Sequence, residues 1–268
     1  MNQNIERSIH DLREMDTLAS GDSPIHRVSA GAKLLVTVVY ILTVVSFDKF
    51  RLSGLLFMVF YPVVLFAVSG ISMSTCFYKL RFILPLVCAV GIFSPILDRT
   101  PAFAIGSFVV TTGMISMLTL LMKGVFCLMA SFLLMATTRI EALCGALRRI
   151  HVPPMLVTLL LLTYRYAAVL AEEANVMTQA YSLRAPGQKG IHYSAWGSFL
   201  GQLLLRSMDR AEELYSSMLL RGYHGEFYYA QERGSTFKDV LYAVLWCAVF
   251  IAARCVNLTQ LMGAAVVR

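Results

Sequence analysis

Charged residues are scarce in this chain of 268 residues: Lys, Arg, Asp and Glu make up 15% of it, while hydrophobic residues make up 57%. A soluble domain carries about 25% charged and 45–50% apolar residues. The shortage of charge excludes an ordinary water-soluble domain and indicates that much of the surface faces lipid. The bilayer is therefore the first partner that we expect.

The motifs of enzymes and of metal sites are also missing. No glycine-rich phosphate loop is present, so we do not expect the chain to bind ATP by itself. The five histidines form no HExxH motif, and the six cysteines form no CxxC pair. Glu172 and Glu173 are neighbouring carboxylates without a basic or metal-binding partner in the pattern around them, and we interpret them as a solvated helix face. We therefore predict no catalytic residue, no metal ligand and no cofactor bound directly.

The net charge of +7 comes from basic residues that flank apolar segments. They are not interleaved with aromatic residues as in a nucleic-acid-binding patch, so a positive-inside bias explains them and no nucleic-acid partner is expected. Residues 1–32 are polar and mixed in charge, and no cleavable signal peptide is expected there.

Apolar segments predict about five membrane spans, since a helix needs roughly 20 mostly apolar residues to cross the bilayer core. The fourth, 105–136, is too long for one perpendicular helix and must tilt, break near Lys123–Gly124 or project into water. The fold class that we predict is an all-α, polytopic membrane helix bundle. It comprises an N-terminal segment 1–32, transmembrane helices in 33–136 and a C-terminal transmembrane helix in 238–268. The candidate spans are 33–47, 52–70, 82–97, 105–136 and 240–256.

Residues 137–237 have a different character. From residue 171 onward, and most clearly over 193–222, apolar residues recur at steps of three and four, which is typical of amphipathic helices. Residues 185–190 break the pattern with Pro and Gly. Residues 155–170 are apolar enough to dip into the membrane, although they carry Arg165. The amphipathic pattern predicts two long helices beside the membrane, too polar to cross it. The polar face of the second helix carries Arg206, Arg210 and Glu213.

Basic residues near the spans predict the orientation. With the N-terminus inside, nine of them lie in the cytoplasm, and the positive-inside rule favours this arrangement. It places 137–237 in the cytoplasm and the chain as a multi-pass protein in the inner (plasma) membrane. The cytoplasmic set is Arg27, Lys33, Lys79, Arg81, Arg139, Arg148, Arg149, Arg233 and Lys238, and the outer set is Lys49, Arg51, Arg99, Arg254 and Arg268.

Three basic residues stand out as candidates for function. Lys123 lies inside the longest apolar run, where it is either a functional intramembrane charge or a lysine that reaches the interface from a tilted helix. Arg184 and Arg221 each end an amphipathic helix shortly before a glycine. Each either caps its helix or projects into a pocket of a partner subunit, and the residue pattern alone leaves both interpretations open.

The two arginine stretches, 180–187 and 218–227, resemble the paired Ala-Arg-Gly/Ser signatures of the transmembrane T component of energy-coupling factor (ECF) transporters. The second is most similar to the cobalt/nickel (CbiQ-like) branch. The resemblance covers most of the chain and includes residues 23–35, 137–154 and 164–173. The signatures depart from the family pattern at Ala185, where Gly or Ser is usual, and at Leu220, where Ala is usual.

The resemblance implies a non-catalytic coupling subunit of an ATP-driven importer. Two cytoplasmic ATPase subunits would dock on the amphipathic helices through Arg184, Ala185, Arg221 and Gly222, and ATP would be used by these partners alone. A separate substrate-binding membrane subunit would carry cobalt or nickel. A T component that serves a vitamin importer is the main alternative, and a membrane-embedded enzyme is a remote one. Neither the substrate nor the subunit stoichiometry follows from the sequence.

Overall fold

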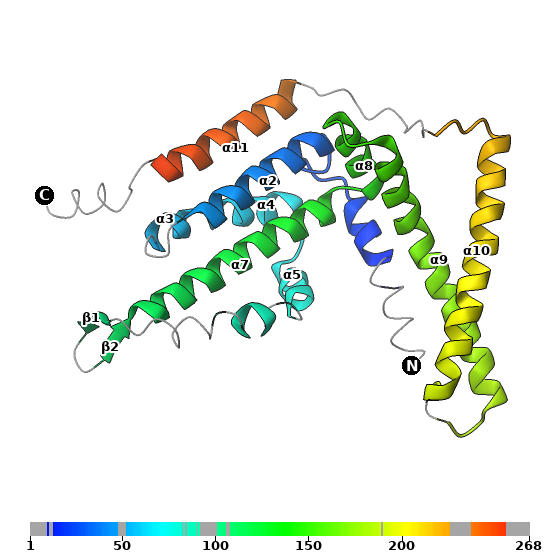
Figure 1. Cartoon of the computed structure of the whole chain (residues 1–268). Coiled ribbons are helices and arrows are strands. Elements are labelled where there is room, and N and C mark those ends of the chain that lie inside the picture. Colours follow the sequence, from blue (N-terminus) through cyan, green and yellow to red (C-terminus); the bar gives the residue numbers. More distant parts are fainter. Residues whose placement is uncertain are drawn as a thin grey trace, which may run out of the picture. The chain divides into compact units, whose positions relative to one another are not determined.

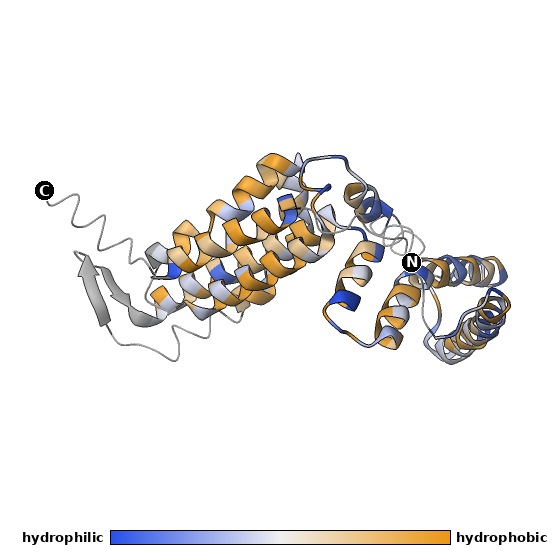
Figure 2. Cartoon of the chain, turned by 90° about the horizontal axis from the view of Figure 1, so that it is seen from above, coloured by the Kyte–Doolittle hydropathy of each residue, from blue (hydrophilic) through white to orange (hydrophobic). Residues whose placement is uncertain are grey.

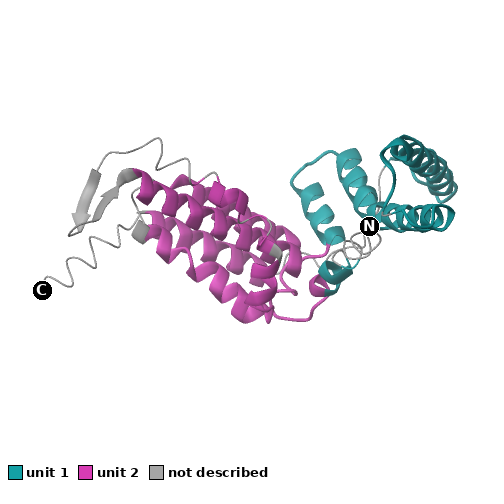
Figure 3. Ribbon diagram, turned by 90° about the horizontal axis from the view of Figure 1, so that it is seen from below, with its two compact units in different colours: residues 1–17, 140–232 teal, residues 18–139, 233–268 magenta. Residues whose placement is uncertain are grey.

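The computed structural model describes residues 10, 13–47, 52–81, 83, 85–89, 91, 101–105, 108–188, 190–225 and 237–255. The chain forms two compact units, which are described separately below. Unit 1 comprises residues 1–17 and 140–232, and unit 2 comprises residues 18–139 and 233–268 (Figure 3).

Unit 2 is a helix bundle built around α2 (Ala30–Ser46), α7 (Thr112–Thr137) and α11 (Phe237–Cys255). Helix α2 packs against both of the others, and α7 also contacts α3 (Leu52–Phe57), α4 (Phe60–Ser69) and α5 (Met73–Leu80) (Figure 1). The described helices of this unit are predominantly hydrophobic (Figure 2). Large apolar side chains on its outer faces, such as Leu42 and Val45, are exposed because lipid is their expected surrounding.

Unit 1 contains α8 (Ile140–Arg149), α9 (Pro154–Arg184), a short 3-10 turn (Tyr193–Ala195) and α10 (Trp196–Leu220). Pro154 starts α9 at a position where a missing N–H costs nothing, because the first amides of a helix have no partner within it. Helix α9 packs against α8 and α10. The predicted break at 185–190 lies between α9 and α10 as expected.

The helical fold class is confirmed, with one short exception. An antiparallel hairpin of β1 (Pro101–Ile105) and β2 (Phe108–Thr111) precedes α7. The predicted span 105–136 was therefore placed too early: its first residues lie in the hairpin, and α7 runs from Thr112 through Lys123 and Gly124 without a break. The third predicted span, 82–97, lies mostly outside the described residues.

Two described helical segments are long and apolar enough to cross a membrane by length and composition, Gly113–Thr137 and Pro154–Arg184. The second includes the stretch 155–170, which the sequence predicts to be apolar enough to dip into the membrane. Arg165 is the one charged residue between 154 and 171. The cytoplasmic location of this region stays a prediction.

The second predicted span is two helices, because Pro62 interrupts it. Proline has no N–H to donate to the carbonyl four residues earlier, which belongs to Met58. The Tyr40 hydroxyl donates to that carbonyl instead, at 3.0 Å, and both side chains are buried. Tyr40 also packs against the rings of Tyr61 and Phe250, with centroids 4.6 and 5.3 Å away.

Tyr40→Phe should destabilise unit 2 by about 1–3 kcal/mol, because it leaves the buried Met58 carbonyl without a donor. Thermal unfolding in detergent measures this change. Adding Pro62→Ala should recover part of the loss, since residue 62 then carries an N–H. The control is Tyr78→Phe at an exposed position. A Tyr40→Phe chain as stable as the parent would contradict the assignment.

Candidate functional site

The end of α10 places Arg221 in solvent. Gly222 has a left-handed φ of 81°, the Tyr223 N–H donates to the Met218 carbonyl at 3.0 Å, and the Gly222 N–H donates to the Leu219 carbonyl at 3.0 Å. This pair of bonds is a Schellman motif, which satisfies the last carbonyls through the backbone. The Arg221 side chain is therefore not needed as a cap.

The end of α9 has a different backbone conformation from the end of α10, but it also presents an exposed arginine, Arg184. The Ala185 N–H donates to the Tyr181 carbonyl at 3.0 Å, and Ala185 has φ −123°, a conformation that needs no glycine. This backbone explains why Ala is accommodated in the first arginine stretch. Arg184 is exposed at the last position of the helix.

Each arginine follows an exposed leucine. Leu183 is 83% exposed and Leu220 is 90% exposed. Within the described residues, neither guanidinium makes a hydrogen bond or ion pair. Two helix ends of unit 1 thus present the same combination of a planar cation and a bare apolar side chain, which suits anchoring in a pocket of another protein.

An open groove of about 460 Å³ lies between α9 and α10 beside Arg184. Tyr181 organises the loop that closes one end of this groove: its hydroxyl donates to Gln188 Oε1 at 3.1 Å and accepts from the His192 N–H at 3.4 Å. The groove walls also include Phe199, Gln202 and Arg206. The sequence pattern did not indicate Tyr181, because its partners follow the helix break.

The adjacent carboxylates Glu172 and Glu173 do have basic partners, contrary to the expectation from sequence. Arg13 Nη2 lies 2.5 Å from Glu172 Oε1, and Arg206 on α10 pairs with Glu173 on α9. These partners are 159 and 33 residues away in the chain, so the local pattern could not reveal them. Tyr164 also donates to Asp16 Oδ1 at 2.7 Å, which holds the N-terminal segment on α9.

Arg206 therefore links the two long helices, while Arg210 and Glu213 are exposed on α10. A second side of α10 remains uncovered within unit 1. It consists of large apolar residues at helical spacing, each about half exposed or more: Leu200, Leu204, Met208, Tyr215 and Leu219.

Lys123 belongs to α7, and its side chain binds the last carbonyls of α2. Its ammonium donates to the Val45 carbonyl at 3.1 Å and to the Phe47 carbonyl. Arg254 of α11 donates to the Ser46 carbonyl between them, at 2.7 Å, and stacks on the Phe47 ring. Helix α2 has no basic residue in its own last turn, so two other helices supply the cations that its dipole favours.

A metal site would need several ligating side chains close together in the described part of the chain. That part contains no group of three or more His, Cys, Asp or Glu side chains placed to hold a metal ion. Burial raises the pKa of the Cys144 thiol in α8, which disfavours a reactive thiolate there.

Comparison with known proteins decides the family. The model of the family described as cobalt transport protein, CbiQ, matches residues 21–230. The chain belongs to this family. The match confirms the resemblance to ECF T components of the cobalt/nickel branch, and it covers both helix ends that carry Arg184 and Arg221.

Individual relatives of this CbiQ-family chain are named as transport proteins. The cobalt transport protein CbiQ of Rhodobacter capsulatus is 34% identical over 45% of this chain and 50% of its own length. The nickel permease LarQ of Lactiplantibacillus plantarum is 29% identical over 39% of this chain and 38% of its own. The energy-coupling factor transporter transmembrane protein EcfT of Clostridium kluyveri is 27% identical over 76% and 81%. The matched region thus spans half or less of the first two relatives.

Exchanging the charges of Arg206 and Glu173 tests the link between α9 and α10. Arg206→Glu places two carboxylates together and should loosen the helix pair, whereas the double change Arg206→Glu, Glu173→Arg should restore it. An exposed pair contributes about 0.2–1 kcal/mol, so amide hydrogen exchange along α10 should rise a few-fold in the single variant. Arg210→Glu is the control. Exchange as fast in the double variant as in Arg206→Glu would refute a specific pair.

Proposed function

We propose that this CbiQ-family membrane protein is the transmembrane coupling subunit of an ECF-type importer in the plasma membrane. Its α9 and α10 grip two cytoplasmic ATPase subunits, and their movement reorients a substrate-binding membrane subunit. The observation that carries the proposal is the pair of exposed Leu–Arg helix ends within one unit, both inside the region that the family model matches.

The guanidiniums suit a partner pocket better than a capping role. Capping is already provided by the backbone at α10, and both side chains extend into solvent without a partner in the described residues. A guanidinium pairs bidentately with a carboxylate and still donates when partly desolvated. The neighbouring Leu183 and Leu220 would exclude water from such a pair.

The exposed apolar side of α10 gives the substrate-binding subunit a surface to dock on. A helix that keeps a row of large apolar side chains uncovered is suited to receive another protein or lipid. The small residue Ala130 is buried within the bundle and permits close packing of α7 against its neighbours there. The chain acts here without catalysis, and ATP is bound only by the ATPases.

Cobalt or nickel is the cargo that we propose, because relatives carry these metals in their names. The metal would be held by the partner subunit as substrate. The orientation that we propose is the one predicted from the basic residues near the spans. It places the N-terminus and residues 137–237 in the cytoplasm, where the ATPases have access to Arg184 and Arg221.

Arg221→Ala should abolish metal uptake in the assembled transporter while the chain still inserts, because the residue lies at an exposed helix end. Removing one member of a buried charge pair costs about 2–5 kcal/mol, whereas removing a cap costs about 0.3–1 kcal/mol. Arg184→Ala should act in the same direction, the double variant should be most severe, and Arg→Lys should rescue only in part.

Co-purification of the ATPases with each variant, together with uptake in vesicles, separates the two roles. Arg165→Ala, an exposed arginine within α9, is the control. The isolated parent chain should bind no nucleotide. Full ATPase recovery and full uptake in the Arg184→Ala, Arg221→Ala double variant would refute the coupling role.

A further inference from the structure

The chain passes between its two units three times, between residues 17 and 18, 139 and 140, and 232 and 233. Residues on the unit 2 side of all three crossings are bound to one short segment, 26–33, at the start of α2. Every contact described below lies within unit 2.

His26 binds the backbone next to the first crossing, and Ser29 binds α11, the first described element after the third crossing. His26 Nε2 lies 3.0 Å from the Leu18 carbonyl, and because a carbonyl can only accept, Nε2 carries the proton. The Ser23 hydroxyl forms a hydrogen bond with His26 Nδ1 at 2.6 Å. At the third crossing, Asp239 in the first turn of α11 accepts from the Ser29 N–H at 3.2 Å.

Lys33 holds the second crossing. Its ammonium donates to the Thr137 carbonyl at 2.7 Å and to the Thr138 hydroxyl at 3.4 Å. Thr137 is the last residue of α7, so its carbonyl has no partner within the helix, and a cation is favoured there. Lys33 is only 4% exposed, and burying an ammonium is costly unless its partners are fixed.

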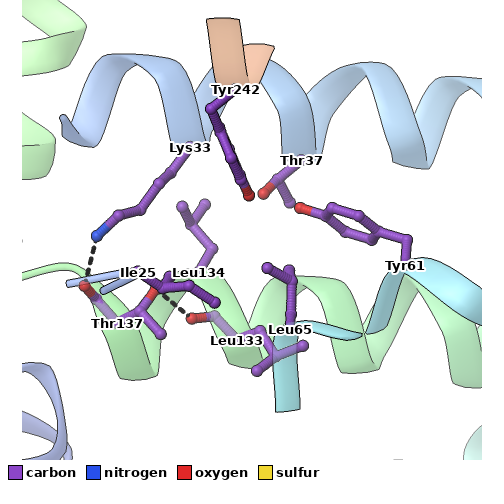
Figure 4. A pocket seen from close by; sticks show the side chains of 9 residues that line it. All are labelled: Ile25, Lys33, Thr37, Tyr61, Leu65, Leu133, Leu134, Thr137 and Tyr242. Atoms are coloured by element: carbon purple, nitrogen blue, oxygen red, sulfur yellow. Dashed lines mark hydrogen bonds between the residues drawn. The ribbon is translucent and has the colours of Figure 1, made fainter. Parts of the chain in front are cut away.

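The space beside Lys33 is small and lies next to the positive charge of the ammonium. The cavity between α2, α4, α7 and α11 measures about 10 Å³ and is lined by the hydroxyls of Thr37, Tyr61 and Tyr242 (Figure 4). A volume near 10–15 Å³ holds about one water molecule. The ammonium would repel a metal cation in this space, so we assign Lys33 to the helix ends around it.

We propose that segment 26–33 is the mechanical joint of the transporter and that Lys33 is its central positioning residue. Described residues of unit 2 near each of the three connections are bound to segment 26–33, which leads into α2, and α2 itself packs against α7 and α11. Displacement of unit 1 is then passed to the whole bundle instead of bending each connection separately. The proposal rests on the coupling function argued above.

Lys33→Met tests the joint in the complete transporter, reconstituted in liposomes with its ATPases and substrate-binding subunit. The variant keeps the length of the side chain and removes its donors. The ATPases should still co-purify and hydrolyse ATP, whereas metal uptake per ATP should fall about tenfold. Lys33→Arg should restore part of the uptake. Thr138→Val, which removes one acceptor and leaves the charge, should lower the ratio less.

Arg254→Met is the control, since it removes a cation that binds the other end of α2, away from the crossings. It should lower thermal stability and leave uptake per ATP unchanged. An unchanged ratio of metal uptake to ATP hydrolysis in Lys33→Met would refute the proposed joint. A loss of uptake that is explained entirely by loss of assembled complex, in both Lys33→Met and Thr138→Val, would also refute it. Failure of the parent chain to retain the ATPases would instead refute the proposed function.

Discussion

The structure of unit 2 depends on one constraint. A backbone carbonyl that loses its helical partner in lipid must find a hydrogen-bond donor within the protein. Three interruptions described in this unit meet that requirement with a side chain from another helix. Tyr40 serves the carbonyl that Pro62 leaves free, Lys123 and Arg254 serve the end of α2, and Lys33 serves the end of α7. These bonds join helices as well as end them, because donor and acceptor belong to different elements. The bundle is thereby fastened at both ends of α2.

Unit 1 differs, because it leaves the arginine and leucine side chains at the ends of α9 and α10 exposed. Its helices are joined by surface ion pairs such as Arg206–Glu173, and α10 ends in a backbone cap that spares the arginine. A membrane protein that needs to be moved by partners in water requires such a division. One part is held together internally, and the other presents cations and apolar side chains for partners to bind. The family match supports a role of the chain in transport.

Local sequence patterns predicted much of this architecture. The apolar run 33–47 became α2, the amphipathic run 193–222 became α10, and the break at 185–190 was correct, since each depends on residues close in the chain. The patterns did not reveal the interruption near Pro62 or the hairpin before α7. The partners of Glu172 and Glu173, and the burial of Lys33, also escaped them. The bonds of Glu172, Glu173 and Lys33 join residues 33 to 159 positions apart, where periodicity carries no information. For the site, the residue pattern singled out Arg184 and Arg221, the resemblance implied their binding role, and that role stays a prediction.

Photo-crosslinking from the two exposed leucines is the most direct measurement of the central claim, that both helix ends of unit 1 bind ATPase subunits. A photoreactive amino acid would replace Leu183 or Leu220 in the full chain, co-expressed with its ATPases and substrate-binding subunit, and mass spectrometry would identify the captured chain. The account predicts that both positions capture an ATPase, with a lower yield when the adjacent arginine is changed to alanine. Capture of lipid or of the substrate-binding subunit at both positions, with no ATPase adduct at either, would contradict it.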